Sequence, residues 1–152
     1  MKNIKAIIFD AYGTLFDVNS AAEKCKEKLG DRWEVFANYW RTTQLEYTWL
    51  RNLMKRHKDF WMITEDSLDK SMKVFNIETS MKNELLDLYK VLLSYPEVGE
   101  TLEKLKEKNY KLSILSNGTP SLLNQLVSNN NLEKIFDDIF SIEEVGVFKP
   151  DS

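Results

Sequence analysis

Residues 4–15 read IKAIIFDAYGTL, and this stretch decides the fold. Its first half, 4–9, is a continuous apolar run that favours a β-strand covered on both faces, as in a parallel sheet. Asp10, Gly13 and Thr14 follow the run directly. A carboxylate placed after a buried strand lies at the edge where parallel α/β sheets bind their ligands. Gly13 lets the chain turn sharply enough to bring Thr14 back beside Asp10.

A long helical stretch comes next. Between Phe16 and Tyr95 the sequence holds one glycine, Gly30, and no proline. Apolar residues recur there at the three- and four-residue spacing that places them on one face of a helix. We therefore predict a helical subdomain over residues 17–95.

The pattern changes at Pro96. Residues 98–109 favour a helix, 111–115 a second strand and 138–141 a third strand. The turn 116–118 follows the second strand, and a loop leads from the third strand to the C-terminal Lys-Pro pair.

Another helix is expected between the second and third strands. Thr119 and Pro120 make a good helix start, with threonine as the N-cap and proline in the first turn. The apolar face of this helix is predicted to comprise Leu122, Leu123, Leu126 and Val127. The order strand, helix, strand, helix, strand predicts a Rossmann-like α/β core with a parallel sheet, built from residues 1–16 and 96–152.

The composition excludes several classes of protein. Of the 152 residues, 43% are hydrophobic, which is enough for a packed core. The 24 acidic and 21 basic residues give a net charge of −3, which favours neither nucleic acid nor a polybasic membrane anchor. No apolar run has the length of a membrane span, so we expect a soluble, cytoplasmic protein. The one cysteine, Cys25, cannot form an intramolecular disulfide and is predicted to be a surface or half-buried thiol.

Three strand ends are expected to bring reactive groups together. Asp10 follows the first strand, Ser116 and Asn117 follow the second, and Lys149 follows the third. Asp10 alone would be read as an ordinary turn residue. An acid, an anion-binding turn before a helix N-terminus and an ammonium group at one edge instead indicate an active site.

Three short motifs carry a resemblance to a known family. DAYGTL at 10–15, LSNG at 115–118 and KP at 149–150 resemble the first three motifs of the haloacid dehalogenase superfamily. The resemblance covers essentially the whole chain. It implies that residues 17–95 form the helical cap that this superfamily inserts after its first motif.

Two further features resemble the L-2-haloacid dehalogenases within that superfamily. Tyr12 stands where the phosphatases of the superfamily have a second aspartate, two residues after the nucleophile. The segment WRTTQLEYTWLRNLM, 40–54, is similar to the part of the cap that reads the substrate. On a helix Arg41 would lie on the same face as Ala37 and Leu45, four residues to either side, so it can face a pocket. Without the resemblance, a solvent-exposed arginine is the expected case.

The resemblance implies two-step covalent catalysis on a small 2-haloacid. Asp10 would attack C2 of the substrate and form an ester, and water would release a D-2-hydroxyacid. Lys149 would keep Asp10 ionised and aimed, Thr14 would orient it, and Arg41 would receive the halide and the carboxylate. No metal or organic cofactor is implied, because halide leaves without protonation.

The resemblance also implies the pocket. Its walls would be Tyr12, Leu45 and Phe60, and the groups that hold the substrate carboxylate would be Ser116 and Asn117. Gln44 is interpreted as only a neighbour of Arg41. The single histidine, His57, lies among surface charges and is expected to be solvated, so a Ser-His-Asp mechanism is not available.

Members of this family continue well beyond the third motif, and we expect the fold to be incomplete after Ser152, without the fourth motif. The first strand, 6–9, would then be an exposed apolar edge. Three functions stay open: a dehalogenase with impaired turnover, a non-enzymatic remnant that is inactive or needs a separate C-terminal piece, and a magnesium-dependent phosphatase, the least favoured. Intact relatives commonly pair, so a homodimer is possible.

Overall fold

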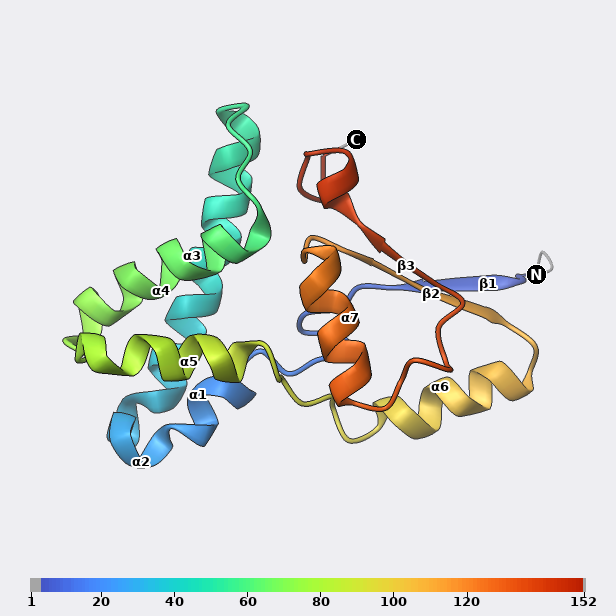
Figure 1. The fold of residues 1–152 in the computed structure, drawn as a ribbon, viewed down its shortest axis with the longest axis horizontal. Coiled ribbons are helices and arrows are strands. Elements are labelled where there is room, and N and C mark those ends of the chain that lie inside the picture. The colour runs from blue at the N-terminus through green and yellow to red at the C-terminus, as the bar shows by residue number, and fades with distance from the viewer. Residues whose placement is uncertain (1–3, 152) are drawn as a thin grey trace.

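The computed structural model describes residues 4–151 and shows a small parallel sheet beside a body of helices (Figure 1). In chain order the elements are β1 (Ala6–Phe9), α1 (Ser20–Lys24), α2 (Lys26–Leu29), η1 (Gly30–Arg32), α3 (Trp33–Leu53), α4 (Phe60–Phe75), η2 (Thr79–Met81), α5 (Lys82–Tyr89), α6 (Val98–Glu107), β2 (Lys111–Ser116), α7 (Pro120–Asn129), β3 (Asp138–Ser141) and η3 (Ile142–Glu144). The predicted core segments 1–16 and 96–152 extend slightly beyond the described residues at both ends.

The three strands form one parallel sheet in the order β1-β2-β3. Ile8 pairs with Ser113, and Ser113 pairs in turn with Asp138. The α/β class with a helical insertion is confirmed. The third predicted strand has the observed bounds, and the second is one residue longer than predicted.

The sheet is covered by helices on one face only. The strand order β1-β2-β3 means that both connections cross the sheet in the same direction. Because such connections are right-handed, α6 and α7 lie on the same side of the sheet (Figure 1). On the other side Ile8 is 61% exposed, and Leu115 and Phe140 are also exposed. The prediction that the first strand is covered on both faces is therefore wrong. Ile7 and Phe9, which alternate with Ile8, pack on the core.

Helix α7 begins as the sequence predicted. The Thr119 hydroxyl accepts a hydrogen bond from the amide of Leu122 at 3.4 Å, and Pro120 is the first helical residue. All four residues of the predicted apolar face are buried. The helix start lies next to the end of β2, which fixes the turn 116–118 at the edge of the sheet.

The helical insertion leaves and rejoins the core through two segments that run side by side. Residues 15–17 and 93–95 pair in opposite directions, with a hydrogen bond of 2.8 Å from the Asp17 amide to the Leu93 carbonyl. A second backbone bond of 3.1 Å joins the same two segments. The chain therefore enters and leaves the cap, α1 to α5, at one place, in the lower half of Figure 1.

The cap has its own apolar interior, in which α3 and α4 pack against each other. The indole nitrogen of Trp40 donates to the carbonyl of Thr64 at 3.1 Å and ties the two helices together. Cys25, at the junction of α1 and α2, is buried in this interior, so the prediction of a surface or half-buried thiol is wrong. Over residues 4–151 no helix combines the length and the apolar character needed to cross a membrane.

The packing of α7 predicts how two substitutions on this helix change the free energy of unfolding. Leu123 is fully buried, whereas the next residue, Asn124, is exposed. We expect Leu123→Ala to lower the free energy of unfolding by about 2–5 kcal/mol, because it removes buried methyl groups and leaves a cavity. Asn124→Ala on the same helix should change it by less than about 0.5 kcal/mol. Urea unfolding followed by circular dichroism measures both, and equal effects would contradict this packing.

Candidate active site

Asp10 and Lys149 meet at the edge of the sheet. Asp10 follows β1 directly, and its carboxylate oxygen Oδ1 lies 2.8 Å from the Nζ of Lys149. The same Nζ donates to the carbonyl of Leu115, near the end of β2, at 2.5 Å. The two side chains keep 44% and 32% of their surface exposed. The carboxylate is thus held by an ammonium group and still reachable from outside.

Asn117 fixes the backbone that carries Lys149. The backbone amide of Lys149 donates to Oδ1 of Asn117 at 2.8 Å, and Nδ2 of Asn117 donates back to the Lys149 carbonyl at 3.5 Å. Ser116 is buried, and its hydroxyl accepts the backbone N–H of Gly118 at 3.1 Å. A hydroxyl that accepts one hydrogen bond can still donate another, so Ser116 keeps a donor for a ligand.

Arg41 reaches from the cap to the loop that holds Asp10. It lies on α3, and its Nη2 donates to the carbonyl of Tyr12 at 2.9 Å. Its Nη1 donates to Oε1 of Gln44 at 2.8 Å. A guanidinium presents five N–H donors, so these two bonds leave donors for an anion.

Gln44 is the centre of a buried polar network, which corrects its interpretation as only a neighbour. Its Nε2 donates to the Thr64 hydroxyl at 2.6 Å and to the Tyr89 hydroxyl at 3.1 Å, while its Oε1 accepts from Arg41. Burial raises the pKa of Tyr89, and the charge of Arg41 and the bond to Gln44 oppose that rise. The spacing of residues 41 and 44 on one helix face was a signal for this contact.

Tyr12 forms the aromatic floor between the core and the cap. Its ring lies 5.0 Å from that of Phe60 and 5.8 Å from that of Tyr89, measured between centroids. A side chain at Gly118 would have its Cβ 2.7 Å from the Tyr12 ring, so only glycine fits there. Among the described residues nothing bonds to the buried Tyr12 hydroxyl. Burial, with Tyr89 and Asp10 adding to it, raises the pKa of this phenol well above its usual value.

Two predicted site residues are less closely tied to the others. Thr14 is exposed, and its backbone amide donates to the Ala11 carbonyl at 3.3 Å in the turn after Asp10. Within residues 4–151 no hydrogen bond joins its hydroxyl to Asp10. Leu45 is half-buried on α3, one turn beyond Arg41.

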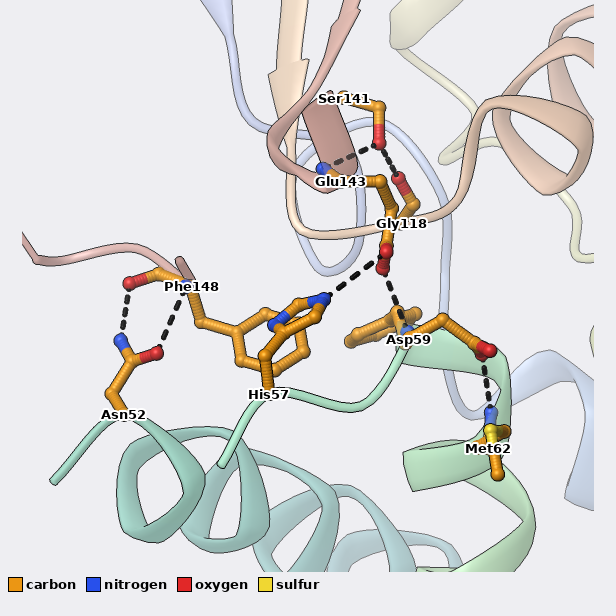
Figure 2. Close-up of polar contacts among 9 residues, drawn as sticks. Asn52, His57, Asp59, Met62, Gly118, Ser141, Glu143 and Phe148 are labelled. Carbon is orange, nitrogen blue, oxygen red and sulfur yellow. Dashed lines mark hydrogen bonds and ion pairs between the residues drawn. The ribbon is translucent and has the colours of Figure 1, made fainter. Parts of the chain in front are cut away.

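His57 contacts the core, so the expectation of a solvated histidine is wrong. Its Nε2 lies 3.2 Å from Oε2 of Glu143, and its ring lies 4.8 Å from that of Phe148 (Figure 2). Its side chain is 28% exposed. This contact could not be predicted from local sequence patterns, because Glu143 and Phe148 follow the third strand, far from His57 along the chain. Among the described residues, no three His, Cys, Asp or Glu side chains cluster as a metal site.

Comparisons with known proteins agree with this geometry. The family model of the haloacid dehalogenase-like hydrolases matches residues 4–152. The chain is 38% identical to (S)-2-haloacid dehalogenase 4A of Burkholderia cepacia, over 98% of this chain and 65% of that protein. It is 41% identical to (S)-2-haloacid dehalogenase 1 of Pseudomonas sp. (strain CBS-3), over 99% of this chain and 67% of that protein.

Solved structures give the same result. The L-2-haloacid dehalogenase of Xanthobacter autotrophicus with chloropropionic acid covalently bound matches with a TM-score of 0.88 and 39% identity, over 97% of this chain and 60% of that one. A crystal structure of a dehalogenase matches with a TM-score of 0.96 and 37% identity, over 99% and 68%. The chain spans about two thirds of the length of the curated relatives it matches. With the strand-edge aspartate, the lysine beside it and the helical insertion in their places, the chain belongs to the haloacid dehalogenase-like hydrolases.

Proposed function

We propose that this chain carries the chemistry of an L-2-haloacid dehalogenase, with Asp10 as the nucleophile. The observation that carries the proposal is the 2.8 Å contact of Lys149 with Asp10 at the edge of the sheet, next to Arg41 of the cap. The substrate class comes from the relatives, whose names specify 2-haloacids, and from the relative with chloropropionic acid covalently bound.

The first step is displacement of the halide. Lys149 holds Oδ1 of Asp10, so Oδ2 is the oxygen available to attack. It attacks C2 of the haloacid from the side opposite the halogen. The C2–O bond forms as the C2–halogen bond breaks, the halide leaves with the bonding pair, and the configuration at C2 inverts.

The second step is hydrolysis of the resulting ester. Water adds to the carbonyl carbon of Asp10, and the bond from that carbon to the substrate oxygen breaks. One proton of the water ends on the hydroxyl of the D-2-hydroxyacid and the other passes to solvent, which restores the Asp10 carboxylate. Halide leaves without protonation and the nucleophile is a side chain, so neither step needs a metal or an organic cofactor.

The remaining residues bind and orient the substrate. We propose that Arg41 binds the departing halide and the substrate carboxylate, because its guanidinium has N–H donors to spare and lies beside the loop after Asp10. Tyr12 and Phe60 form the apolar wall, and Leu45 extends it along α3. The polar groups at the end of β2 serve the substrate carboxylate, with Ser116 donating its hydroxyl and Asn117 its backbone N–H. Thr14 is assigned to orient Asp10 once substrate is bound.

The phosphatase alternative requires a second acid two residues after the nucleophile. Tyr12 stands at that position, and burial raises the pKa of its phenol. A phenol with a raised pKa stays protonated at neutral pH and is a poor general base. The geometry around Tyr12 therefore favours carbon–halogen chemistry over phosphoryl transfer.

The proposal predicts halide release together with a covalent adduct at Asp10. The purified protein is incubated with L-2-chloropropionate, chloride is titrated, and the mass at Asp10 is followed by peptide mass spectrometry. We expect either continuous chloride release or one equivalent of chloride with a trapped ester, because both require attack by Asp10. The Asp10→Asn variant should give neither.

Two outcomes would contradict the proposal. One is the absence of both chloride and adduct with the wild-type protein. The other is cleavage of p-nitrophenyl phosphate that depends on added Mg²⁺, since this would restore the phosphatase alternative.

A second prediction concerns Lys149. Its Nζ bonds both the Asp10 carboxylate and the Leu115 carbonyl, so Lys149→Ala should leave the nucleophile without its charged support. We expect the rate of ester formation to fall on the order of 100-fold, as when a preorganised charged donor is removed. Lys108→Ala, at the exposed end of α6, is the matched control and should retain the wild-type rate. Equal rates for the two variants would remove Lys149 from the mechanism.

A further inference from the structure

The groups of the proposed site come from both the core and the cap, so the whole site forms only when the two are in contact. Lys149 lies after η3, in residues 145–151, where the structure shows no helix or strand. Arg41 and Phe60 belong to the cap helices α3 and α4. The chain enters and leaves the cap through residues 15–17 and 93–95, in the lower half of Figure 1. Asn52 at the end of α3 and His57 of the following loop contact Phe148 of the C-terminal segment (Figure 2).

Asn52, near the end of α3, binds the backbone of Phe148 in both directions. Its Nδ2 donates to the Phe148 carbonyl at 2.5 Å, and its Oδ1 accepts the Phe148 amide at 3.0 Å (Figure 2). Asn117 of the core binds the next residue, Lys149, in the same way. Two consecutive residues are therefore held by two asparagines, one from the cap and one from the core. This double attachment aims the Lys149 side chain at Asp10.

Glu143 makes another contact between core and cap. Its Oε2 lies 3.2 Å from Nε2 of His57 (Figure 2). Its Oε1 accepts a hydrogen bond from the backbone amide of Phe60, at the N-terminus of α4, at 3.0 Å. A carboxylate is favoured at this end of a helix, because the free backbone amides carry partial positive charge. The Glu143 side chain is only 18% exposed. It thereby fixes the start of α4, where Phe60 packs against Tyr12.

We propose that Asn52 and Glu143 are positioning residues that form a clasp between cap and core. Asn52 sets Lys149 against Asp10 through the backbone of Phe148, and Glu143 sets Phe60 over Tyr12 through the start of α4. The catalytic part of this inference rests on the proposed function, because it assigns the clasp to the covalent step at Asp10. The structural part, the dependence of the Lys149 backbone on Asn52, stands on the contacts alone.

The first test measures ester formation in a single turnover with L-2-chloropropionate, followed by intact-protein mass spectrometry. We expect Asn52→Ala to slow the step about 10- to 100-fold, because a displacement of about 1 Å has effects of that size. The control Asn83→Ala removes an exposed asparagine from cap helix α5 and should keep the wild-type rate.

Glu143 offers a rescue test. Glu143→Gln keeps an oxygen that can accept the Phe60 amide, so it should retain the rate within about threefold, whereas Glu143→Ala should slow it about tenfold or more. Glu144→Ala, at the exposed neighbouring position, is the matched control. Glutamine and alanine variants with equal rates would overturn the role of Glu143. If Asn52→Ala does not fold, as judged by circular dichroism, this rescue pattern decides the proposal.

A second readout does not depend on activity. Hydrogen exchange by NMR follows the amides of Phe148 and Lys149, whose bonds go to Asn52 and Asn117. In Asn52→Ala we expect both amides to exchange about tenfold faster, while the amide of Ile114 in β2 keeps its protection.

The two readouts separate failure of the clasp from failure of the proposed function. If the wild-type protein forms no ester, the proposed function fails, and the exchange of the Lys149 amide still decides the clasp. Faster exchange of that amide in Asn52→Ala supports the clasp, and unchanged exchange overturns it. A wild-type rate of ester formation in folded Asn52→Ala also overturns it.

Discussion

The contact between Lys149 and Asp10 is the interaction on which the site depends, because it joins residues 139 positions apart in the sequence. The parallel sheet makes it possible, since the carboxyl ends of β1 and β2 lie at one edge. The lysine reaches that edge from the segment after η3 and also bonds the Leu115 carbonyl. Its single ammonium group therefore ties the C-terminal segment to the ends of both strands, and it holds Asp10, the proposed nucleophile.

Local signals in the sequence predicted most of the fold. The third strand has the predicted bounds, and α7 starts at Thr119 and Pro120, because an N-cap hydroxyl and a proline in the first turn act within a few residues. The covering of β1 was predicted wrongly. An apolar run such as 4–9 indicates burial on both faces, but the number of helices on each face is a property of the topology, and Ile8 is exposed. Cys25 was misjudged for a similar reason, since charged neighbours do not show which way one side chain of a short helix points.

The candidate site could be predicted where strand ends define it. The meeting of Asp10 with Lys149 follows from the rule that parallel strands bring their carboxyl ends together. The supporting contacts could not be predicted in this way, because they join the cap to distant parts of the chain. The reach of His57 to Glu143 depends on how the loop after α3 folds against the core. Gln44 is an intermediate case. Its position three residues after Arg41 on one helix indicates the contact with Arg41, but no local pattern indicates its bonds to the hydroxyls of Thr64 and Tyr89.

The paired segments 15–17 and 93–95 determine how the cap can move. Backbone hydrogen bonds join these two segments, so the chain enters and leaves the cap at one narrow hinge. A swing of the cap about this hinge is the motion that such an attachment favours. Such a swing changes distances least near the hinge and most at the loop between α3 and α4, which lies opposite the C-terminal segment in Figure 1. Arg41, part-way along α3, would travel a shorter arc than Asn52 near the end of that helix, so its guanidinium would stay closer to the loop after Asp10.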